Sequence, residues 1–325
     1  MITIQTWQER AWELYTTKSD STTIRDISRQ VEFEFHTDEE WYDRIRWYIY
    51  RRRKQEEKGV TPTQPRIAVQ NQEPEHYTSK WDGTESIKFA IMGDTQLGSK
   101  YAQLTYLHEF YNLCETEGVK DVYHVGDITD GLKMRVGHEY ELYTVSADDM
   151  RDEVIKNYPR REGITTHFIT GNHDASIYKQ VGYDIGRAIA NARSDMKYLG
   201  KDCAVVNLTP QCTLELRHPW DGTAYALSYK VQKMVEAMES DSKPNILAVG
   251  HYHKAEYLFY RNVHVFQTGC FQGQTPFTRG KGISIHLGGW IIEVRVDKEG
   301  TIQGIKQEFV PFYASVKDDW KNFKR

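Results

Sequence analysis

SIKFAIMGDTQ, residues 86–96, is a short apolar run that ends on a polar cluster, and three later stretches have the same form. They are DVYHVGDITD (121–130), ITTHFITGNHD (164–174) and NILAVGHYH (245–253). Each run has the length of a β-strand. Helix-like stretches at about 103–117 and 144–160 separate the first three, and strand-like runs such as ISIHL (283–287) dominate after residue 255. This order predicts an α/β fold, a two-sheet β-sandwich flanked by helices.

The polar clusters are expected to lie together, because functional groups of open α/β sheets sit beyond the carboxyl ends of the strands. Carboxylate, imidazole and amide oxygen are ligands suited to Mn²⁺, Fe or Zn²⁺. We expect the glycine before each cluster to permit a tight turn. One such cluster alone is more often a capped turn than a ligand, but four in this order indicate a metal site. The clusters supply Asp94, Gln96, Asp127, Asp130, Asn172, His173, His251 and His253.

In this order, GDTQ, GDITD, GNHD and GHYH resemble the signature of the calcineurin-like metallophosphoesterases over roughly residues 87–270. The resemblance implies a dimetal-dependent hydrolase of phosphoesters. Two cations about 3.5–4 Å apart would grip the phosphate oxygens. The family also needs a histidine between the third and last motifs, and His218 is the only one there. The implied ligands are Asp94, Gln96, Asp127 and His253 for the first metal, and Asp127, Asn172, His218 and His251 for the second.

The same resemblance implies a catalytic pair. His173 is the family's non-ligand histidine, a general acid for the leaving oxygen. Asp130 would orient its imidazole and raise its pKa. Asp174 is expected to brace the loop.

Two positions depart from the family's pattern. Gln96 stands where most members have histidine, and an amide oxygen is a poorer ligand, so the first site should be weaker and more tolerant of Mn²⁺ or Mg²⁺ than of Zn²⁺. His218 is followed by Pro219 and Trp220 instead of the usual glycine. The expected cofactors are two divalent cations, Mn²⁺ first, with Fe, Zn²⁺ and Mg²⁺ as alternatives.

The loop after GDITD contains candidates for substrate contact. His138 and Arg135 lie there with Lys133. His108, His124, His167, His264 and His286 fall inside helix or strand patterns and are expected to be core or surface residues.

Residues 1–58 are predicted to form a small helical module of three short helices, of helix-turn-helix type in one interpretation. Thr23 with Asp26, and Thr37 with Glu40, have the spacing of capping boxes. The proline-containing stretch 59–85 is predicted to be a linker, and 86–325 the phosphoesterase domain. The third helix has an apolar stripe, Trp41, Ile45, Tyr48 and Ile49, and ends on a basic run.

Two substrate hypotheses stay open. The first is a nucleic-acid phosphodiesterase, a DNA nuclease, because Arg51, Arg52 and Arg53 beside aromatic residues suit phosphates and unpaired bases. The second is a phosphatase or phosphodiesterase for a small nucleotide or a phosphoprotein, with the module serving for homo-oligomerisation and the stripe buried between chains. The intact motifs argue against a third hypothesis, a non-enzymatic scaffold that kept the fold and lost the catalytic activity.

Composition bounds the remaining choices. The chain has 325 residues, 39% of them hydrophobic and 27% charged, with a net charge of −4, which is typical of a soluble globular protein and excludes a polybasic binder. The sequence has no run of 18 apolar residues, so we expect no membrane partner. The four cysteines form no CxxC pair, and a turn at Thr209-Pro210 would pair residue 207 with 212. Free thiols and a cytoplasmic location are expected.

Overall fold

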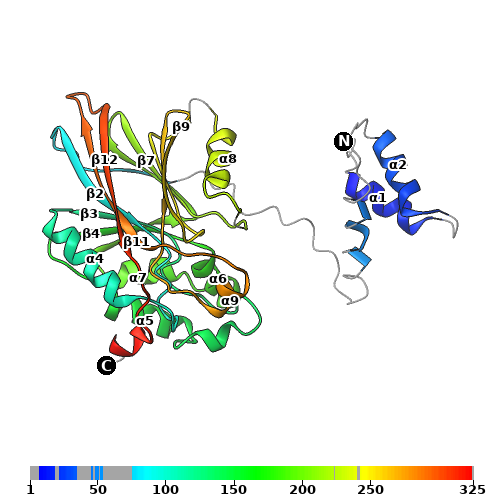
Figure 1. Ribbon diagram of the computed structural model, residues 1–325, viewed down its shortest axis with the longest axis horizontal. Coiled ribbons are helices and arrows are strands. Elements are labelled where there is room, and N and C mark those ends of the chain that lie inside the picture. The colour runs from blue at the N-terminus through cyan, green and yellow to red at the C-terminus, as the bar shows by residue number, and fades with distance from the viewer. Residues whose placement is uncertain are drawn as a thin grey trace. The chain divides into compact units, whose positions relative to one another are not determined.

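The computed structural model describes residues 7–18, 22–34, 45–46, 48–50, 52–53, 75–222, 224–239 and 242–323. The chain divides into two compact units, Met1–Gln72 and Glu73–Arg325 (Figure 1). Among the described residues, no helix is long and apolar enough to cross a membrane.

The regular structure among the described residues of the first unit is helical. It contains α1 (Trp7–Thr16) and α2 (Ile24–Glu34), and residues 45–46, 48–50 and 52–53 are also helical. The Thr23 amide donates to Asp26 Oδ2 at 2.9 Å, and the Asp26 amide donates to Thr23 Oγ1 at 3.3 Å. These reciprocal bonds are the predicted capping box. The second predicted box, Thr37 with Glu40, lies outside the described residues.

The apolar stripe of the third helical stretch is buried inside this unit. Ile45 and Ile49 are at most 1% exposed and pack with Ala11, Ile27 and Val31. These two stripe residues therefore form an intramodule core and are not available to a second chain, whereas Trp41 is not among the described residues.

The second unit contains two six-stranded sheets. In one sheet, the four neighbouring strands β2 to β5 run parallel, and β11 and β12 are antiparallel at its edge. Its order is β12 (Ile302–Phe312), β11 (Leu287–Val296), β2 (Ser86–Met92), β3 (Asp121–Val125), β4 (Thr165–Thr170) and β5 (Met196–Lys201).

The other sheet is mixed. Strands β7, β8 and β10 run parallel, β1 is parallel to β6, and β6 and β9 are antiparallel to β7 and β10. Its order is β1 (Glu75–Thr78), β6 (Cys203–Thr209), β7 (Cys212–Arg217), β8 (Ile246–Val249), β10 (Val263–Thr268) and β9 (Ala255–Tyr260).

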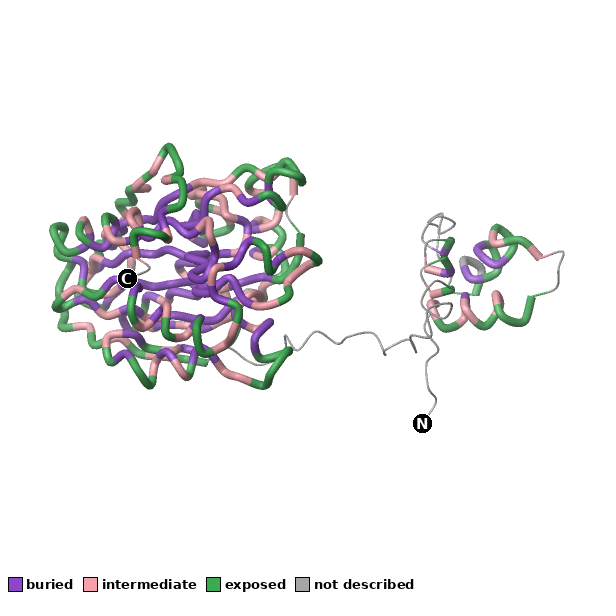
Figure 2. The backbone as a smooth tube through the Cα atoms, turned by 90° about the horizontal axis from the view of Figure 1, so that it is seen from below, coloured by how far each residue is buried: buried purple, intermediate pink, exposed green. Residues whose placement is uncertain are grey.

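Alternation along the strands builds the layers. On β2, Phe89 and Ile91 face the second sheet, whereas Ala90 and Met92 pack under helices on the outer face. Those helices are α4 (Leu104–Thr116), α5 (Ala147–Asn157), α6 (Asn172–Val181) and α7 (Ile185–Ala192). On the far side, α8 (Tyr229–Ala237) packs on β8 and β10. Buried backbone fills the centre of this unit (Figure 2), so the predicted sandwich flanked by helices is confirmed.

Short helical turns complete the second unit. They are η1 (His138–Glu141), α9 (Pro276–Gly280) and η2 (Asp319–Phe323).

The predicted linker 59–85 is too long at its C-terminal end. Residues Glu75–Thr78 form β1, which pairs with β6 through its backbone. Only Tyr77 of this strand is half-buried. A polar edge strand of this kind has no hydrophobic alternation for a sequence analysis to find.

Two strand predictions were also wrong in detail. ISIHL (283–287) is not a strand of its own, because only Leu287 belongs to β11 and the His286 backbone bonds instead to His253 and Cys270 of neighbouring loops. In the β6–β7 hairpin, Asn207 pairs with Thr213 and not with residue 212, because the register shifts before Thr209. Free thiols are confirmed for Cys114, Cys203, Cys212 and Cys270.

Candidate metal centre

Parallel strands of both sheets end at one place, and the four motifs follow them there. Asp94 and Gln96 follow β2, Asp127 follows β3, His218 follows β7 and His251 follows β8. Asn172 and His173 open α6 directly after β4. The His251 amide donates to Asp94 Oδ2 at 2.9 Å, which joins the two sheets through the motif loops.

The backbone at these loops is strained. Asp94, Gln96, Asp127, His251 and His253 all have φ between 52° and 76°, the left-handed region that non-glycine residues rarely adopt. Such residues cost about 1–3 kcal/mol each and persist only where the surroundings impose them. Five of the seven implied ligands are therefore aimed by unusual backbone conformations.

The motif glycines are needed mainly because a side chain would collide with neighbouring atoms, and less because the backbone makes a tight turn. A Cβ on Gly171 would lie 2.3 Å from Asp127 Oδ1, and one on Gly126 would lie 2.6 Å from His218 Nδ1. Of the four, only Gly126 has a positive φ, +94°. The expectation that each glycine permits a tight turn is thus wrong for the other three, at which the neighbouring side chains and backbone pack against the bare Cα.

The residues implied for the second metal are close together. Asn172 Oδ1 lies 3.0 Å from His218 Nε2 and 2.8 Å from His251 Nδ1, and Asp127 Oδ2 lies 3.2 Å from His218 Nε2. One ligand atom each of Asp127, His218 and His251 fits within a mutual distance of 4.8 Å.

Hydrogen bonds to carbonyl groups orient both imidazoles. His218 Nδ1 lies 2.7 Å from the Val125 carbonyl oxygen, and His251 Nε2 lies 2.6 Å from that of Asp221. A carbonyl oxygen only accepts, so each of these nitrogens carries a proton and donates it. The other nitrogen of each ring faces Asn172, and an imidazole anchored in this way is ready to coordinate a metal.

The residues implied for the first metal are less closely assembled. His253 Nε2 lies 3.3 Å from Asp94 Oδ1, and Gln96 Nε2 lies 3.3 Å from Asp127 Oδ2. Gln96 Oε1 is buried and accepts no hydrogen bond from the described residues. The oxygen and nitrogen of a side-chain amide are assigned from their hydrogen bonds. With the Gln96 amide rotated by about 180°, its Oε1 would face Asp127 and could coordinate a cation there.

These residues fit divalent cations. Asp94 and Asp127 are at most 1% exposed and lie in neighbouring loops, and two buried carboxylates need positive charge beside them. All seven side chains offer oxygen or nitrogen, and the buried Gln96 oxygen has no hydrogen-bond partner in the part of the chain that the structure describes. The residues implied for the first and for the second metal can therefore hold divalent cations. Asp127 contacts Gln96 of the first set and His218 of the second.

His173 and Asp130 lie beside Asp127. His173 Nδ1 is 3.1 Å from Asp130 Oδ1 and 2.7 Å from the Asp130 carbonyl oxygen, and the His173 amide donates to Asp127 Oδ1 at 2.8 Å. Burial alone would lower the pKa of His173, but the charges of Asp127 and Asp130 raise it to about 9. Burial alone would raise the pKa of Asp130, but its bonds to His138 and His173 lower it to about 2.

The expected substrate contacts are placed differently. His138 is 0% exposed, and its Nε2 lies 3.3 Å from Asp130 Oδ2, behind the pair instead of on the surface. Arg135 is paired with Glu141 and lies 4.5 Å above the Phe277 ring.

The arginines of the first unit also differ from one another. Arg52 donates to the Tyr48 hydroxyl at 2.7 Å and lies 4.7 Å above the Trp12 ring, so it packs within its own unit. Arg53 is exposed, and Arg51 lies outside the described residues.

Asp174 braces two motif loops, as the sequence analysis expected. Its carboxylate accepts the amides of Ile128, Thr129 and Gly171 at 2.9–3.1 Å, and the Thr129 hydroxyl at 2.7 Å. The loops after β3 and β4 are therefore fixed to each other.

Sequence reasoning missed two supporting residues, Asp202 and Asp221. The Asp202 carbonyl accepts the His218 amide at 2.7 Å, and the Asp221 carbonyl accepts from His251. Both act through backbone oxygens, which leave no signature in a sequence.

Of the histidines expected in the core, His124 lies nearest the centre. It is fully buried between the Thr95 hydroxyl, 3.1 Å from Nε2, and the Gly126 amide, which donates to Nδ1. Burial lowers its pKa to about 3, so it stays neutral and supports the loops without being a ligand.

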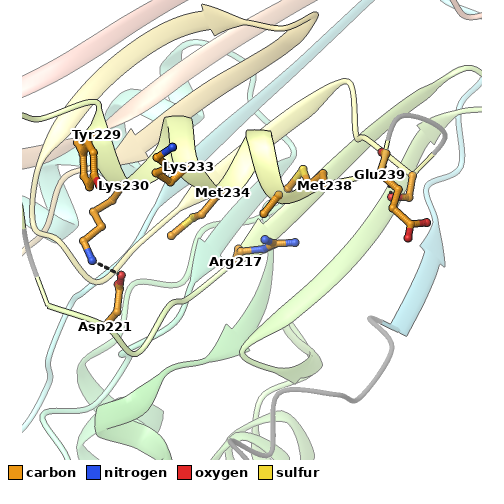
Figure 3. Close-up of a pocket in the computed structure, with 10 residues that line it drawn as sticks. Arg217, Asp221, Tyr229, Lys230, Lys233, Met234, Met238 and Glu239 are labelled. Carbon is orange, nitrogen blue, oxygen red and sulfur yellow. Dashed lines mark hydrogen bonds and ion pairs between the residues drawn. The ribbon is translucent and has the colours of Figure 1, made fainter. Parts of the chain in front are cut away.

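A pocket of about 660 Å³ adjoins the centre beneath α8 (Figure 3). Its Asp221 bonds Lys230, as the dashed line shows, while Lys233 pairs with Glu236 and Arg217 pairs with Glu215. Because these three cations already have acidic partners, the pocket offers little to a phosphate.

Comparisons with known proteins are distant. No protein-family profile matches the chain. It is 25% identical over 198 residues to the DNA polymerase II small subunit of Methanothermobacter thermautotrophicus, covering 50% of this chain and 40% of that protein. The protein of the same name from Halobacterium salinarum is 25% identical over 237 residues, 61% of this chain and 46% of its own length. The chain thus spans less than half the length of these relatives.

Solved structures give weaker likenesses. A novel archaeal phosphodiesterase matches with a TM-score of 0.40 and 13% identity, covering 69% of this chain and 100% of that one. Vps29 of Entamoeba histolytica, complexed with zinc, matches with a TM-score of 0.34 and 14% identity, covering 69% and 99%. The described architecture, two six-stranded sheets whose strand ends bring the four motifs together, is the sandwich that the sequence predicted.

Proposed function

We propose that the chain is a dimetal-dependent phosphodiesterase acting on nucleic acid, DNA first. The observation that carries this proposal is the position of Asp127. Its Oδ2 lies within 3.3 Å of both Gln96 Nε2 and His218 Nε2, so one carboxylate faces both ligand groups, and its Oδ1 accepts the His173 amide.

The residues of the site would have separate roles in holding the two cations. Asp94, Gln96 and His253 would hold one divalent cation, Asn172, His218 and His251 would hold the other, and Asp127 would contact both. When bound, such a pair polarises phosphoryl oxygens and activates water. The carbonyls of Val125 and Asp221 keep the two second-site imidazoles in their orientation.

His173 would supply the proton. Its Nδ1 is held by Asp130, so Nε2 is the nitrogen that can donate to a leaving oxygen. In the metal-free chain the charges of Asp127 and Asp130 raise the pKa of His173 to about 9. With cations on Asp127, Asp130 would remain beside the ring to hold the proton that His173 donates as the phosphorus–oxygen bond breaks.

Two features support nucleic acid as the substrate. The curated relatives are each named as the small subunit of a DNA polymerase. In the first unit, Arg53 and the aromatic residue Tyr50 are both exposed and stand three positions apart in the chain. Mn²⁺ is the metal we propose, because the amide of Gln96 replaces an imidazole in the first group.

The test uses the purified full chain with Mn²⁺ and end-labelled single- and double-stranded DNA, resolved on a gel. Bis-(p-nitrophenyl) phosphate in parallel reports hydrolysis of any diester. We expect metal-dependent cleavage of both classes of substrate, abolished by a chelator. Hydrolysis of the small diester alone would contradict the nucleic-acid assignment, and no hydrolysis of either with any divalent metal would contradict the proposal as a whole.

A further inference from the structure

Three chain segments bring two exposed aromatic side chains together with two lysines beside the metal centre. Tyr178 and Lys179 come from α6, Lys201 is the last residue of β5, and Trp220 follows β7. Tyr178 is 51% exposed and Trp220 is 38% exposed. We call these four residues the aromatic–lysine patch.

Each ring of the patch is covered by a lysine amine. Lys179 Nζ lies 3.7 Å from the centre of the Trp220 ring, and Lys201 Nζ lies 4.4 Å from that of Tyr178. Trp220 Nε1 donates to Asp202 Oδ1 at 2.8 Å, which fixes the plane of the indole. The indole of Trp220 is therefore held in place, whereas the lysine amines end flexible stems.

The patch is tied to the metal centre by short connections. Asn172 and His173 are the first residues of α6, so Tyr178 is about 9 Å further along the same helix at 1.5 Å per residue. Trp220 is two residues after His218, whose amide donates to the Asp202 carbonyl at 2.7 Å. The patch consequently borders the second ligand group.

We propose that the patch is a stacking platform for an unpaired base of a single-stranded nucleic acid whose neighbouring phosphate lies at the metal centre. The inference rests on the proposed phosphodiesterase function and names its substrate more narrowly. Base stacking on aromatic rings accepts every base, since all have a π-face. An internal base of a duplex is stacked on its neighbours on both sides, whereas an unpaired base can turn a free face to Trp220.

The lysines make this occupant fit better than an apolar partner. A base that stacks on the Trp220 ring displaces the Lys179 amine from it. The displaced amine can then pair with a phosphate next to that base. The same exchange is available to Lys201 at Tyr178. The patch thus offers both parts of single-strand recognition, rings for the bases and cations for the backbone.

The test measures binding without turnover. The full chain is titrated in EDTA with a fluorescent oligothymidylate and with a duplex of the same length. A second strand that contains 5-bromouridine is photocrosslinked, and the crosslinked peptides are identified by mass spectrometry. The variants are Trp220→Ala, Tyr178→Ala and the conservative Trp220→Phe. Tyr313→Ala, at a residue that is 95% exposed directly after β12, is the matched control.

We expect crosslinks at Trp220 or Tyr178, and single-strand affinity about ten-fold lower in Trp220→Ala and Tyr178→Ala, with Trp220→Phe and Tyr313→Ala close to the parent. Unchanged affinity in both alanine variants, or crosslinks confined to other peptides, would overturn the platform. Tyr178→Ala lies on the helix surface and keeps the test valid should Trp220→Ala fold poorly.

The two proposals fail in different ways. Cleavage of the small diester without any single-strand binding would overturn the platform and leave a phosphoesterase. Patch-dependent binding without hydrolysis by the metal-loaded protein would support the platform and overturn the proposed function.

Discussion

The two ligand groups of the candidate metal centre differ in how closely their side chains are assembled. In the second group, Asn172 Oδ1 lies 3.0 Å from His218 Nε2 and 2.8 Å from His251 Nδ1. The other nitrogen of each imidazole is fixed by a hydrogen bond to a backbone carbonyl. In the first group, the nearest contacts are 3.3 Å, and Gln96 turns its amide nitrogen toward Asp127.

The difference teaches where preorganisation comes from. A histidine has two ring nitrogens, so one can donate a hydrogen bond to the protein while the other stays available to coordinate a metal. Gln96 has no anchor outside the ligand groups, because its Nε2 donates to Asp127, itself an implied ligand, and its Oε1 accepts no hydrogen bond from the described residues. We therefore expect the second site to bind metal more tightly than the first.

The largest effect is expected where the two groups meet. Asp127→Asn removes a charge that faces both, so turnover of a diester should fall to the level of the chelator-treated protein, and bound metal should fall with it. Metal content by mass spectrometry and diester hydrolysis check this. Asp121→Asn, at the opposite end of β3, is the matched control and should keep both. Normal activity in Asp127→Asn would break the idea of a shared carboxylate.

His173 lies beside both groups without belonging to either. His173→Ala should lower turnover by about 10²–10⁴-fold while metal content stays at the parent value, because the residue donates a proton and holds no cation. Substrates with a good leaving group should suffer less. His167→Ala, on β4, provides a histidine control. Loss of metal from His173→Ala would instead place this residue among the ligands.

Without metal, the imidazoles of His218 and His173 should both be protonated at neutral pH. The charge of Asp127, working against burial, raises the pKa of His218 to about 9, and that of His173 is also about 9. A raised folded-state pKa stabilises the fold fully below the unfolded value of about 6.5, and this stability is lost as the pH rises through 9.

The melting temperature of the EDTA-treated protein should therefore fall between pH 6.5 and 9. Metal replaces the His218 proton, so the fall should be smaller in Mn²⁺. His251, with its pKa lowered to about 4 by burial and by His218, acts only at lower pH. Equal slopes with and without metal, measured by calorimetry, would show that no cation displaces these protons.

The sequence predicted the ends of the strands better than the geometry beyond them. β2, β3, β4 and β8 follow from apolar runs, because a strand buried on both faces leaves a continuous apolar signal. The ligand types were readable for the same reason, since each stands directly after such a run.

The conformations of those loops were not predictable. Nothing in GDTQ shows that Asp94 and Gln96 have a positive φ, because such strain is imposed by contacts between distant loops. The burial of His138 behind Asp130 depends in the same way on how the η1 turn folds back. Backbone carbonyls such as that of Asp221 leave no residue signature at all.

The smallest expected effect is the most direct test of the comparison between the groups. Gln96→His gives the first group an imidazole in place of a neutral amide, and imidazole nitrogen binds Mn²⁺ and Zn²⁺ better than an amide oxygen. The metal concentration that gives half-maximal activity should fall several-fold, with the weaker phase of a metal titration moving toward the tighter one. Gln272→His, at a buried glutamine that bonds Ser99 outside the ligand groups, is the matched control and should leave both phases unchanged. An unaltered weaker phase in Gln96→His would mean that Gln96 is not a ligand, and the first group would then have to be completed by water.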